Sequence, residues 1–573
     1  MKRLPLLLCI LLTGLVTPVF GKLDGTYMNE AGMTLKTPHA AWDEKGELPH
    51  KKILFIMQQT ASREIIELVQ RFPGFEYEVV LTANEHSIGA DDIYSNPIAG
   101  LSTADKHQEL ADKLAKDYDL VVVANVDFAI LPDEQKFRLM SMVRNGTGLV
   151  RIQSSEPWSE LKKLPYKKPY AKPLPRPEWV AGSNGLPGSR PENFESRIFN
   201  AWQFGHGRIV EVDYGAGYRA GVGLTPYFDY TTDWLFLYET SQAFLAQVLY
   251  YASGVELPAF SVRQDSGKFV VASPEKTTVE GRIRQTDNSV IRNSLDFTNL
   301  PAGKYTADVL VRRNGALVNF GAFPFTVESA FGAVSVEAPR LVQNRGPFSG
   351  TLKLASPAQN GYSVKVELMD APYRNVWFSK TLPLEAGKKE FPFDLENYRM
   401  PTIGGYLRCT VYDARGHAAH AEKPVIFPDY SLEDYLQLTW GQVGCTFNPA
   451  FGERIIDRLG WNVSLQFFSK GDIENTLRNE KLCPYICRIG MEAGPNNETR
   501  ILRKLWSEQK ENMERLGTLN GDESFYHPLV RKLWADDLRR QAEYLKDLSP
   551  VLYNLGDENF YTYDAGFGES DKQ

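Results

Sequence analysis

Cysteine is scarce in this sequence. Only five cysteines occur among 573 residues, and one of them, Cys9, lies in an apolar run at the start of the chain; Cys409, Cys445, Cys483 and Cys487 remain. So few cysteines exclude a disulfide-based scaffold. In the strand-like "KLCPYICRIG", Cys483 and Cys487 would share a face about 13 Å apart, and no histidine lies near them in sequence. We therefore expect buried cysteines, no metal site and no cofactor.

Long basic runs are absent as well. The formal net charge is -7, which argues against a nucleic-acid partner. The apolar run "LPLLLCILLTGLV" is too short to span a bilayer comfortably, and no later segment reads as a membrane span. Because the run follows Lys2 and Arg3 and precedes "TPVFG", residues 1–21 are predicted to be a signal peptide. We expect a secreted or periplasmic protein with no membrane association once this peptide is removed.

The length exceeds what one hydrophobic core can organise. A chain of 573 residues is expected to form about three to five domains. Aromatic residues make up 12% of the chain, which suits carbohydrate-facing surfaces and β-sandwich cores equally well. Composition alone therefore leaves the function open.

Residues 50–255 have the pattern of an α/β domain. Strand-like and helix-like segments alternate through "KKILFIM", "SREIIELVQRF", "YEVVLTA", "DYDLVVVANV", "PDEQKFRLMSMVRNG" and "TGLVRIQ". The near-continuous apolar strands are typical of a buried parallel sheet, and the alternation predicts a doubly wound sheet. A Pro- and Lys-rich passage, "PYKKPYAKPLPRPEW", interrupts it, and the helix-like "DWLFLYETSQAFLAQVLYYASG" closes the domain.

This unit resembles the class I glutamine amidotransferase-like fold. Active members carry a cysteine on the sharp turn after a central strand, which maps near "VRIQSSEPW" here. No cysteine occurs between Cys9 and Cys409. Ser154 or Ser155 with His206 as base is the alternative, but nothing nearby completes a triad or a glycine-flanked elbow. We expect a structural, non-catalytic domain.

Between residues 256 and 430 the hydrophobic period changes to two. Alternating segments include "KFVVASP", "SLDFTNL", "KYTADVLVRR", "ALVNFGAFPFTV", "GTLKLAS", "YSVKVELMD", "VWFSKTL" and "GYLRCTVYDARG". Turn sequences such as "PAGK", "RNGA" and "EAGKK" separate them. The pattern predicts two β-sandwiches in tandem, at 256–330 and 331–430.

Residues 431–573 return to alternating strands and helices. The predicted strands are "DYLQLTWGQVG", "WNVSLQFF", "LCPYICRIG" and "PVLYNLG". Asp557 and Glu558 then lie at the carboxyl end of a fourth parallel strand, where (β/α)8 barrels carry their active sites. A carboxyl group there can protonate the leaving oxygen of a glycoside if its pKa is raised.

This last region resembles the first half of a clan-A glycoside hydrolase barrel, of the β-galactosidase type that carries an amidotransferase-like domain. The resemblance implies a carbohydrate substrate and makes Glu558 the general acid/base. Trp440 at the end of the first strand and Arg488 at the end of the third fall where sugar-contacting residues usually lie, and Asn559 is placed with them.

One residue departs from that family. The clan usually has Asn before the acid/base Glu, whereas this sequence has Asp557. An Asp-Glu pair at this position resembles the β-N-acetylhexosaminidases, in which the Asp orients the acetamido group of the substrate. Those enzymes carry a His and a second Gly ahead of the pair, where this chain has Asn554 and Leu555. The sugar class therefore stays open.

A second "GDE", at 521–523, precedes a helix-like segment with Pro528 in its first turn. There Asp522 and Glu523 are expected to stabilise the helix N-terminus. The non-catalytic interpretation of Asp557 and Glu558 is likewise a polar turn after a buried strand.

A complete barrel takes roughly 250 residues, and the region from Ser431 supplies 143. The nucleophile would normally come from the seventh strand. We expect either a truncated chain or one completed by another chain, including a homo-oligomer, because an open half-barrel leaves an unpaired edge. Alone, the chain is expected to show no appreciable glycosidase activity. The competing hypothesis is a non-catalytic secreted protein that binds carbohydrate or protein.

Overall fold

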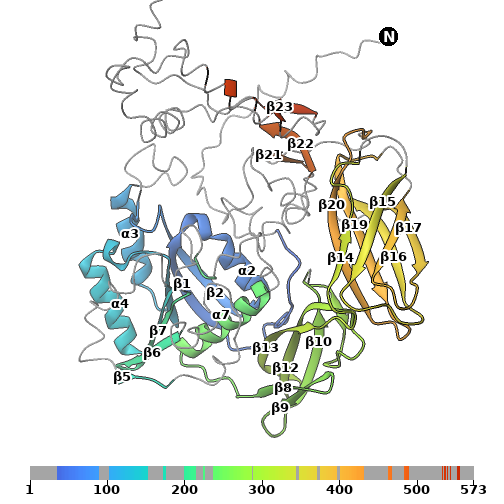
Figure 1. Ribbon diagram of the computed structural model, residues 1–573. Helices are drawn as coiled ribbons and strands as arrows, with labels where there is room; N and C mark the ends of the chain where they lie inside the picture. Colours follow the sequence, from blue (N-terminus) through green and yellow to red (C-terminus); the bar gives the residue numbers. More distant parts are fainter. Residues whose placement is uncertain are drawn as a thin grey trace, which may run out of the picture.

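The computed structural model (Figure 1) combines one sheet that is largely parallel with several antiparallel sheets. It describes residues 35–89, 102–152, 172–175, 199–214, 223–225, 237–286, 288–342, 347–370, 375–395, 400–431, 463–466, 483–488, 532, 535–536, 539, 542–543 and 551–554. The expected mixture of α/β and all-β architecture is confirmed at this coarse level. None of the helices in these ranges is long and apolar enough to cross a bilayer.

The first sheet has seven strands in the order β2-β1-β3-β4-β7-β6-β5. Their bounds are β1 Lys51–Gln58, β2 Phe75–Thr82, β3 Leu120–Ala124, β4 Gly148–Ile152, β5 Lys172–Pro173, β6 Phe199–Phe204 and β7 Gly207–Val212. The first five in that order are parallel, and β6 and β5 add an antiparallel edge. Because β1 lies between β2 and β3, the winding direction reverses between β1 and β3.

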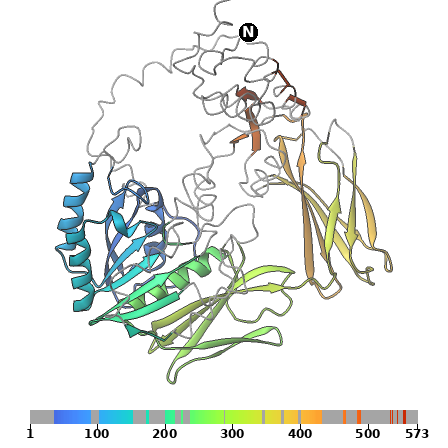
Figure 2. The same cartoon turned by 60° about the vertical axis from the view of Figure 1, so that its left-hand side comes forward.

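Helices cover both faces of this sheet (Figure 2). They are α2 Arg63–Arg71, α3 Thr103–Leu114, α4 Asp133–Asn145 and α7 Tyr238–Ala252, with short 3-10 turns η1 Gln59–Ala61 and η2 Phe128–Ile130. Side chains alternate along β1: Phe55 joins the core under α2 and α7, whereas Ile56 joins the core under α3 and α4. Buried on both sides, the strands are apolar throughout, as a parallel sheet requires.

The helix ends follow local sequence chemistry. The Ser102 side chain accepts a 3.1 Å hydrogen bond from the Asp105 backbone and caps α3. The helix α4 begins directly after Pro132 and ends before Gly146, whose φ of 130° suits a residue without a Cβ. These start and stop residues are why the sequence pattern placed α4 correctly.

Residues 35–50, here called the strap, cross from the α/β part to the first antiparallel part. Trp42 stacks on Phe72 after α2 at 5.7 Å and on Phe320 at 6.0 Å between ring centroids. The Glu47 carboxylate accepts hydrogen bonds from the Arg312 guanidinium and the Leu317 backbone at 2.6 and 3.0 Å. The strap therefore joins the two parts through both apolar and charged contacts.

The first antiparallel part contains a four-stranded sheet, β11-β10-β12-β13, and a two-stranded sheet, β8-β9. Their bounds are β8 Ser261–Asp265, β9 Lys268–Ala272, β10 Thr278–Arg284, β11 Val290–Arg292, β12 Gly303–Arg313 and β13 Ala316–Val327. The β12–β13 turn has Asn314 and Gly315 at φ 53° and 84°, as a two-residue hairpin loop demands. Four buried residues of this part, including Phe320, belong to the α/β core rather than to a core of their own.

The prediction of a strand at "SLDFTNL", residues 294–300, is wrong. Only Asp296 makes a bridge, to Lys268, and the segment otherwise turns. The Asp296 side chain accepts from the Thr298 backbone at 2.9 Å, and Asn299 has a φ of 61°. Local side-chain hydrogen bonds thus override the alternating pattern.

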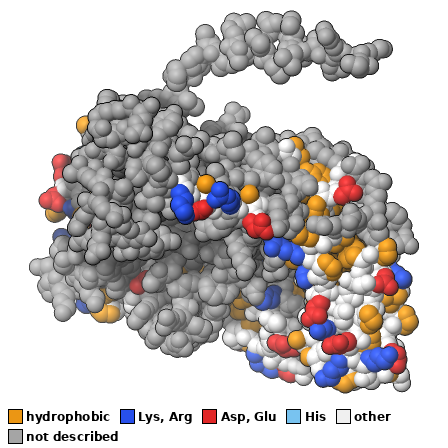
Figure 3. Space-filling model, turned by 45° about the horizontal axis from the view of Figure 1, so that its top comes forward, with side chains coloured by type: hydrophobic (Ala, Val, Ile, Leu, Met, Phe, Trp, Pro, Cys, Tyr) orange, Lys and Arg blue, Asp and Glu red, His pale blue; other side chains and the backbone are white. Residues whose placement is uncertain are grey.

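The second antiparallel part pairs a three-stranded sheet, β14-β15-β18, with a four-stranded sheet, β17-β16-β19-β20. Their bounds are β14 Val334–Glu337, β15 Phe348–Leu354, β16 Ser363–Asp370, β17 Val376–Pro383, β18 Glu390–Leu395, β19 Gly404–Tyr412 and β20 Ala418–Ile426. Leu352 and Phe393 from one sheet and Val366 and Leu407 from the other share one core. On the face in Figure 3, acidic and basic side chains interleave over the part that is described.

A last small sheet is parallel, with its strands in chain order β21-β22-β23. The strands are β21 Val463–Gln466, β22 Cys483–Arg488 and β23 Leu552–Asn554 (Figure 1). Each was predicted from sequence as a strand of the C-terminal region.

Candidate functional site

The carboxyl ends of β22 and β23 lie next to each other. Arg488, the last residue of β22, pairs in register with Asn554, the last residue of β23. The chain leaves β23 there and reaches Asp557 and Glu558 within three to four residues. The backbone thus brings Arg488 and Asn554, which precedes Asp557 by three residues in the sequence, to one edge of a parallel sheet.

The other residues predicted for this site lie outside the described residues. They are Trp440, Asp557, Glu558 and Asn559, and the second acidic pair, Asp522 and Glu523, is outside as well. For Arg488 the backbone position is described.

Cysteine chemistry does not supply a site in the described part. Cys483 and Cys487 lie on one continuous strand, β22, as their spacing predicted. Cys409 is fully buried in the second antiparallel part, and burial raises the pKa of its thiol to about 12. Such a thiol is unreactive at neutral pH. Among the described residues, no group of His, Cys, Asp and Glu side chains could hold a metal ion.

Of the Ser-His alternative in the α/β part, Ser154 and Ser155 lie outside the described residues. His206 is exposed in the turn between β6 and β7, and its backbone N–H donates to Arg144 O at the end of α4. That turn precedes β7, so it lies at the amino edge of the parallel sheet, because β7 and β4 are parallel neighbours. The strand β4 ends with Ile152 at the opposite, carboxyl edge. His206 therefore lies away from the carboxyl ends of the parallel strands.

The carboxyl edge holds a strained residue. Asn125, directly after β3, has a φ of 49°, is fully buried, and neither of its side-chain amide atoms has a hydrogen-bond partner in the described structure. The Gln58 side chain donates to its carbonyl at 2.9 Å from the end of β1. This is the point between β1 and β3 where the winding reverses, the place where doubly wound folds bind ligands. Backbone strain gathers at such sites.

A buried carboxylate lies beside this edge. Glu64, in the first turn of α2, accepts backbone hydrogen bonds from Gly223, Leu224 and Thr225 at 3.2, 2.6 and 2.9 Å. Burial raises its pKa to about 7, although the three N–H donors act in the opposite direction. Glu64 therefore titrates near neutral pH while holding the 223–225 segment against α2.

We expect Glu64 to make stability fall with rising pH. Its pKa is about 7 in the folded protein and near 4.5 when unfolded, so the folded state binds more protons between these values. The contribution is full below pH 4.5 and is lost as the pH rises through 7, by about 3 kcal/mol in total. Thermal unfolding of wild type and Glu64→Gln between pH 4.5 and 8 checks this: the stability difference should change with pH. A constant difference would contradict it.

A buried cluster of four charged groups has a structural role. Glu67 accepts from Arg63 at 2.8 Å, from Arg71 at 3.0 Å and from the Thr37 hydroxyl at 2.8 Å. Arg71 also makes a two-pronged contact with Glu239 of α7, at 2.8 and 2.6 Å. Burial acts to raise the pKa of Glu67, but Arg71 and Arg63 outweigh it and keep the pKa below its usual value. All four charged groups are nearly inaccessible to solvent, so they fasten the strap, α2 and α7 together and cannot meet a substrate.

Sequence reasoning missed Glu64, Asn125 and this ionic cluster. A charge repeated at 63, 67 and 71 on a helix normally indicates a solvated face. An Asn after a buried strand is a weak sign of a left-handed residue. Neither signal identifies the partners, which come from distant parts of the chain.

Comparison with known proteins adds no family assignment. No family model matches the chain, and no curated protein matches it. A tetra-tandem repeat from the extending region of a large adhesion protein is 12% identical, with a TM-score of 0.14, over 40% of this chain and 55% of that one.

Two further similar structures are β-glucuronidases. One, from Parabacteroides merdae, is 12% identical over 43% of this chain and 31% of its own, with a TM-score of 0.17. An FMN-binding β-glucuronidase from Facaelibacterium prausnitzii L2-6 is 9% identical over 53% of this chain and 52% of its own, also with a TM-score of 0.17. The matches span about a third to just over half of these proteins' lengths. With such low scores, functional inference rests on the residues of this chain.

Proposed function

We propose that this chain is part of an exported glycoside hydrolase of the β-galactosidase type, with Glu558 as the general acid. The observation that carries the proposal is the parallel order β21-β22-β23 with Arg488 and Asn554 in register. In parallel β/α architectures the carboxyl ends of adjacent strands assemble one site. Glu558 follows the end of β23 by four residues in the sequence, and this proximity supports a role at that edge.

The chemistry requires two carboxyl groups. Glu558, protonated, gives its proton to the glycosidic oxygen as the bond to the anomeric carbon breaks. A second carboxylate attacks that carbon or activates a water molecule. Arg488 would hold a sugar hydroxyl or carboxylate, and Trp440 would supply a stacking surface for the ring. Asn559 would hydrogen-bond a neighbouring hydroxyl.

Asp557 decides the sugar class. If it receives the N–H of an acetamido group, the substrate carries an N-acetylamino sugar and the acetamido oxygen is the nucleophile. If Asp557 takes the place of the usual Asn, it accepts from a sugar hydroxyl. We favour the second assignment because the His and Gly that precede the pair in hexosaminidases are replaced by Asn554 and Leu555.

Binding of a basic sugar analogue tests the role of Glu558. Titration calorimetry with galacto-, gluco- and glucurono-configured iminosugars should show at least one ligand that binds the 573-residue chain. Glu558→Gln should weaken that ligand at least about tenfold, because the protonated ring nitrogen loses a charged hydrogen bond. Aryl β-glycosides of the same sugars should show no appreciable turnover by the 573-residue chain.

Two variants serve as controls. Glu523→Gln makes the same charge change in the other "GDE" and should leave the affinity unchanged. Asp557→Asn should leave galacto-iminosugar binding within a few-fold but weaken an N-acetylglucosamine thiazoline only if the hexosaminidase-like assignment holds. Equal affinity of wild type and Glu558→Gln for every iminosugar would refute the proposed role.

A further inference from the structure

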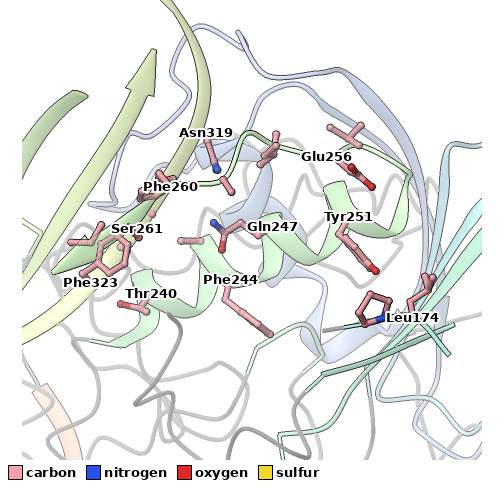
Figure 4. Close-up of a pocket in the computed structure, with 18 of the residues that line it drawn as sticks. Leu174, Thr240, Phe244, Gln247, Tyr251, Glu256, Phe260, Ser261, Asn319 and Phe323 are labelled. Atoms are coloured by element: carbon pink, nitrogen blue, oxygen red, sulfur yellow. The ribbon is translucent and has the colours of Figure 1, made fainter. Parts of the chain in front are cut away.

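A cavity of about 590 Å³ lies between α7 and the first antiparallel part (Figure 4). One wall is a face of α7 with residues at helical spacing, including Thr240, Phe244, Gln247 and Tyr251. The opposite wall comes from the link after α7 and from β8 and β13. This volume is within the range of small-molecule sites, which favour the junctions between domains.

Four aromatic rings line the walls, together with aliphatic side chains. Phe260 and Phe323 pack edge to face at 6.1 Å between centroids, across from Phe244 and Tyr251 of α7 (Figure 4). Gly321 makes this arrangement fit: a Cβ there would lie 2.8 Å from Phe323 Cε2 and 3.0 Å from Phe260 Cζ. The ligand's body must therefore be mainly apolar.

The amide side chains in the walls are already engaged. Gln247 Nε2 donates to Phe320 O at 3.0 Å, which ties α7 to β13. Asn319 Nδ2 donates to Pro258 O at 2.7 Å, and its Oδ1 accepts from the Phe320 backbone at 2.8 Å. These groups hold the walls in place, so they offer little recognition to a polar ligand body.

One end of the cavity is charged. Arg208 and Glu256 are the charged side chains among the described lining residues. The guanidinium lies on the Tyr251 ring, 4.6 Å from its centroid, and donates to Tyr251 O at 3.1 Å, which fixes its orientation. Its contact with Glu256 is 2.9 Å long, but the Glu256 side chain is 75% exposed. An exposed pair of this kind contributes little, so a ligand anion can take the place of Glu256.

We propose that this cavity binds an amphipathic carboxylate, with its apolar body between the aromatic walls and its anionic head on Arg208. The preset guanidinium offers the planar donor pair that a carboxylate fits. Glu256 competes for the same donors and sets the affinity. The described lining includes no residue of β21, β22 or β23, so failure of either proposal leaves the other intact.

Opposite effects of two variants test the site. With 8-anilinonaphthalene-1-sulfonate as the fluorescent probe and decanoate or 3-phenylpropanoate as competitors, wild type should bind one probe per chain. Arg208→Gln should weaken both competitors about tenfold or more, as expected for loss of a charged hydrogen bond. Glu256→Gln removes the competing anion and should strengthen them. Phe260→Ala, at a half-buried ring, should weaken them as well.

The competitors also identify the ligand body and control for non-specific binding. Tighter binding of decanoate indicates that the natural ligand carries an acyl chain, and tighter binding of 3-phenylpropanoate indicates an aryl group. Either result supports the site. Decanol and 3-phenylpropanol, which lack the charge, should compete weakly and be insensitive to Arg208→Gln. Unchanged or weaker carboxylate binding in Glu256→Gln, a variant at an exposed position that should fold normally, would overturn the proposal. So would probe binding that Arg208→Gln leaves intact.

Discussion

Replacing Arg71 with methionine should lower the free energy of unfolding by about 3–5 kcal/mol. Arg71 is fully buried and neutralises Glu239 and, with Arg63, Glu67. Methionine fills much of the space but leaves Glu239 without its charged partner in a site closed to water. Removing one member of a buried ion pair costs far more than the pair contributes, because the remaining charge is uncompensated. The loss would be a large share of the stability of a typical domain.

Urea unfolding followed by circular dichroism measures this effect. Arg263→Met is the matched control: its guanidinium also contacts a carboxylate, Asp265, at 2.7 Å, but the side chain is 65% exposed. It should leave the unfolding midpoint nearly unchanged. The double variant Arg71→Met with Glu239→Gln should recover part of the loss because it removes the stranded charge. Equal effects of Arg71→Met and Arg263→Met would contradict the structural role of the cluster.

Phe320→Ala should cost about 3–5 kcal/mol and destabilise two parts of the molecule at once. The ring lies on β13 yet is fully buried against Phe72, at 4.9 Å, and Trp42. Removing it opens a cavity at the contact between the α/β core, the strap and the first antiparallel part. The two parts should therefore lose stability together.

Hydrogen exchange resolves whether the loss is shared. In Phe320→Ala, protection should fall both in β1–β4 and in β10–β13. Phe137→Ala removes a ring that is 76% exposed on α4 and should change neither. A loss confined to β10–β13 would show that the α/β part does not depend on the contact.

Hydrophobic periodicity predicts those helices and strands whose packing contacts are uniformly apolar or whose end signals lie next to them in the sequence. The apolar strands β1, β3 and β4 and the helix α4 with Pro132 and Gly146 at its ends follow from local patterns. The helix α2 was also predicted, but its charged positions were not expected to be buried. Their burial depends on Thr37 in the strap and Glu239 in α7, which no local pattern links to them.

The candidate sites likewise differ in whether the sequence predicts them. The strand end before Asp557 and the edge position of Arg488 could be anticipated from the order of strands. The cavity could not, because Arg208, Tyr251 and Phe323 come from three elements that meet only in the folded chain. The left-handed Asn125 is a third kind of case, since its backbone is fixed by the ends of β1 and β4 around it.

The strap has a consequence for synthesis on the ribosome. Trp42 emerges early, but Phe320, which stacks on it, follows roughly 280 residues later, and Arg312, the partner of Glu47, emerges shortly before Phe320. At about 5–20 residues per second, that interval lasts about 15–55 s. During this time Trp42, Phe72 and the apolar side of α2 remain without the Phe320 ring that packs against them in the folded protein. A nascent chain of this protein should therefore be a client for a holding chaperone until residue 320 has left the ribosome.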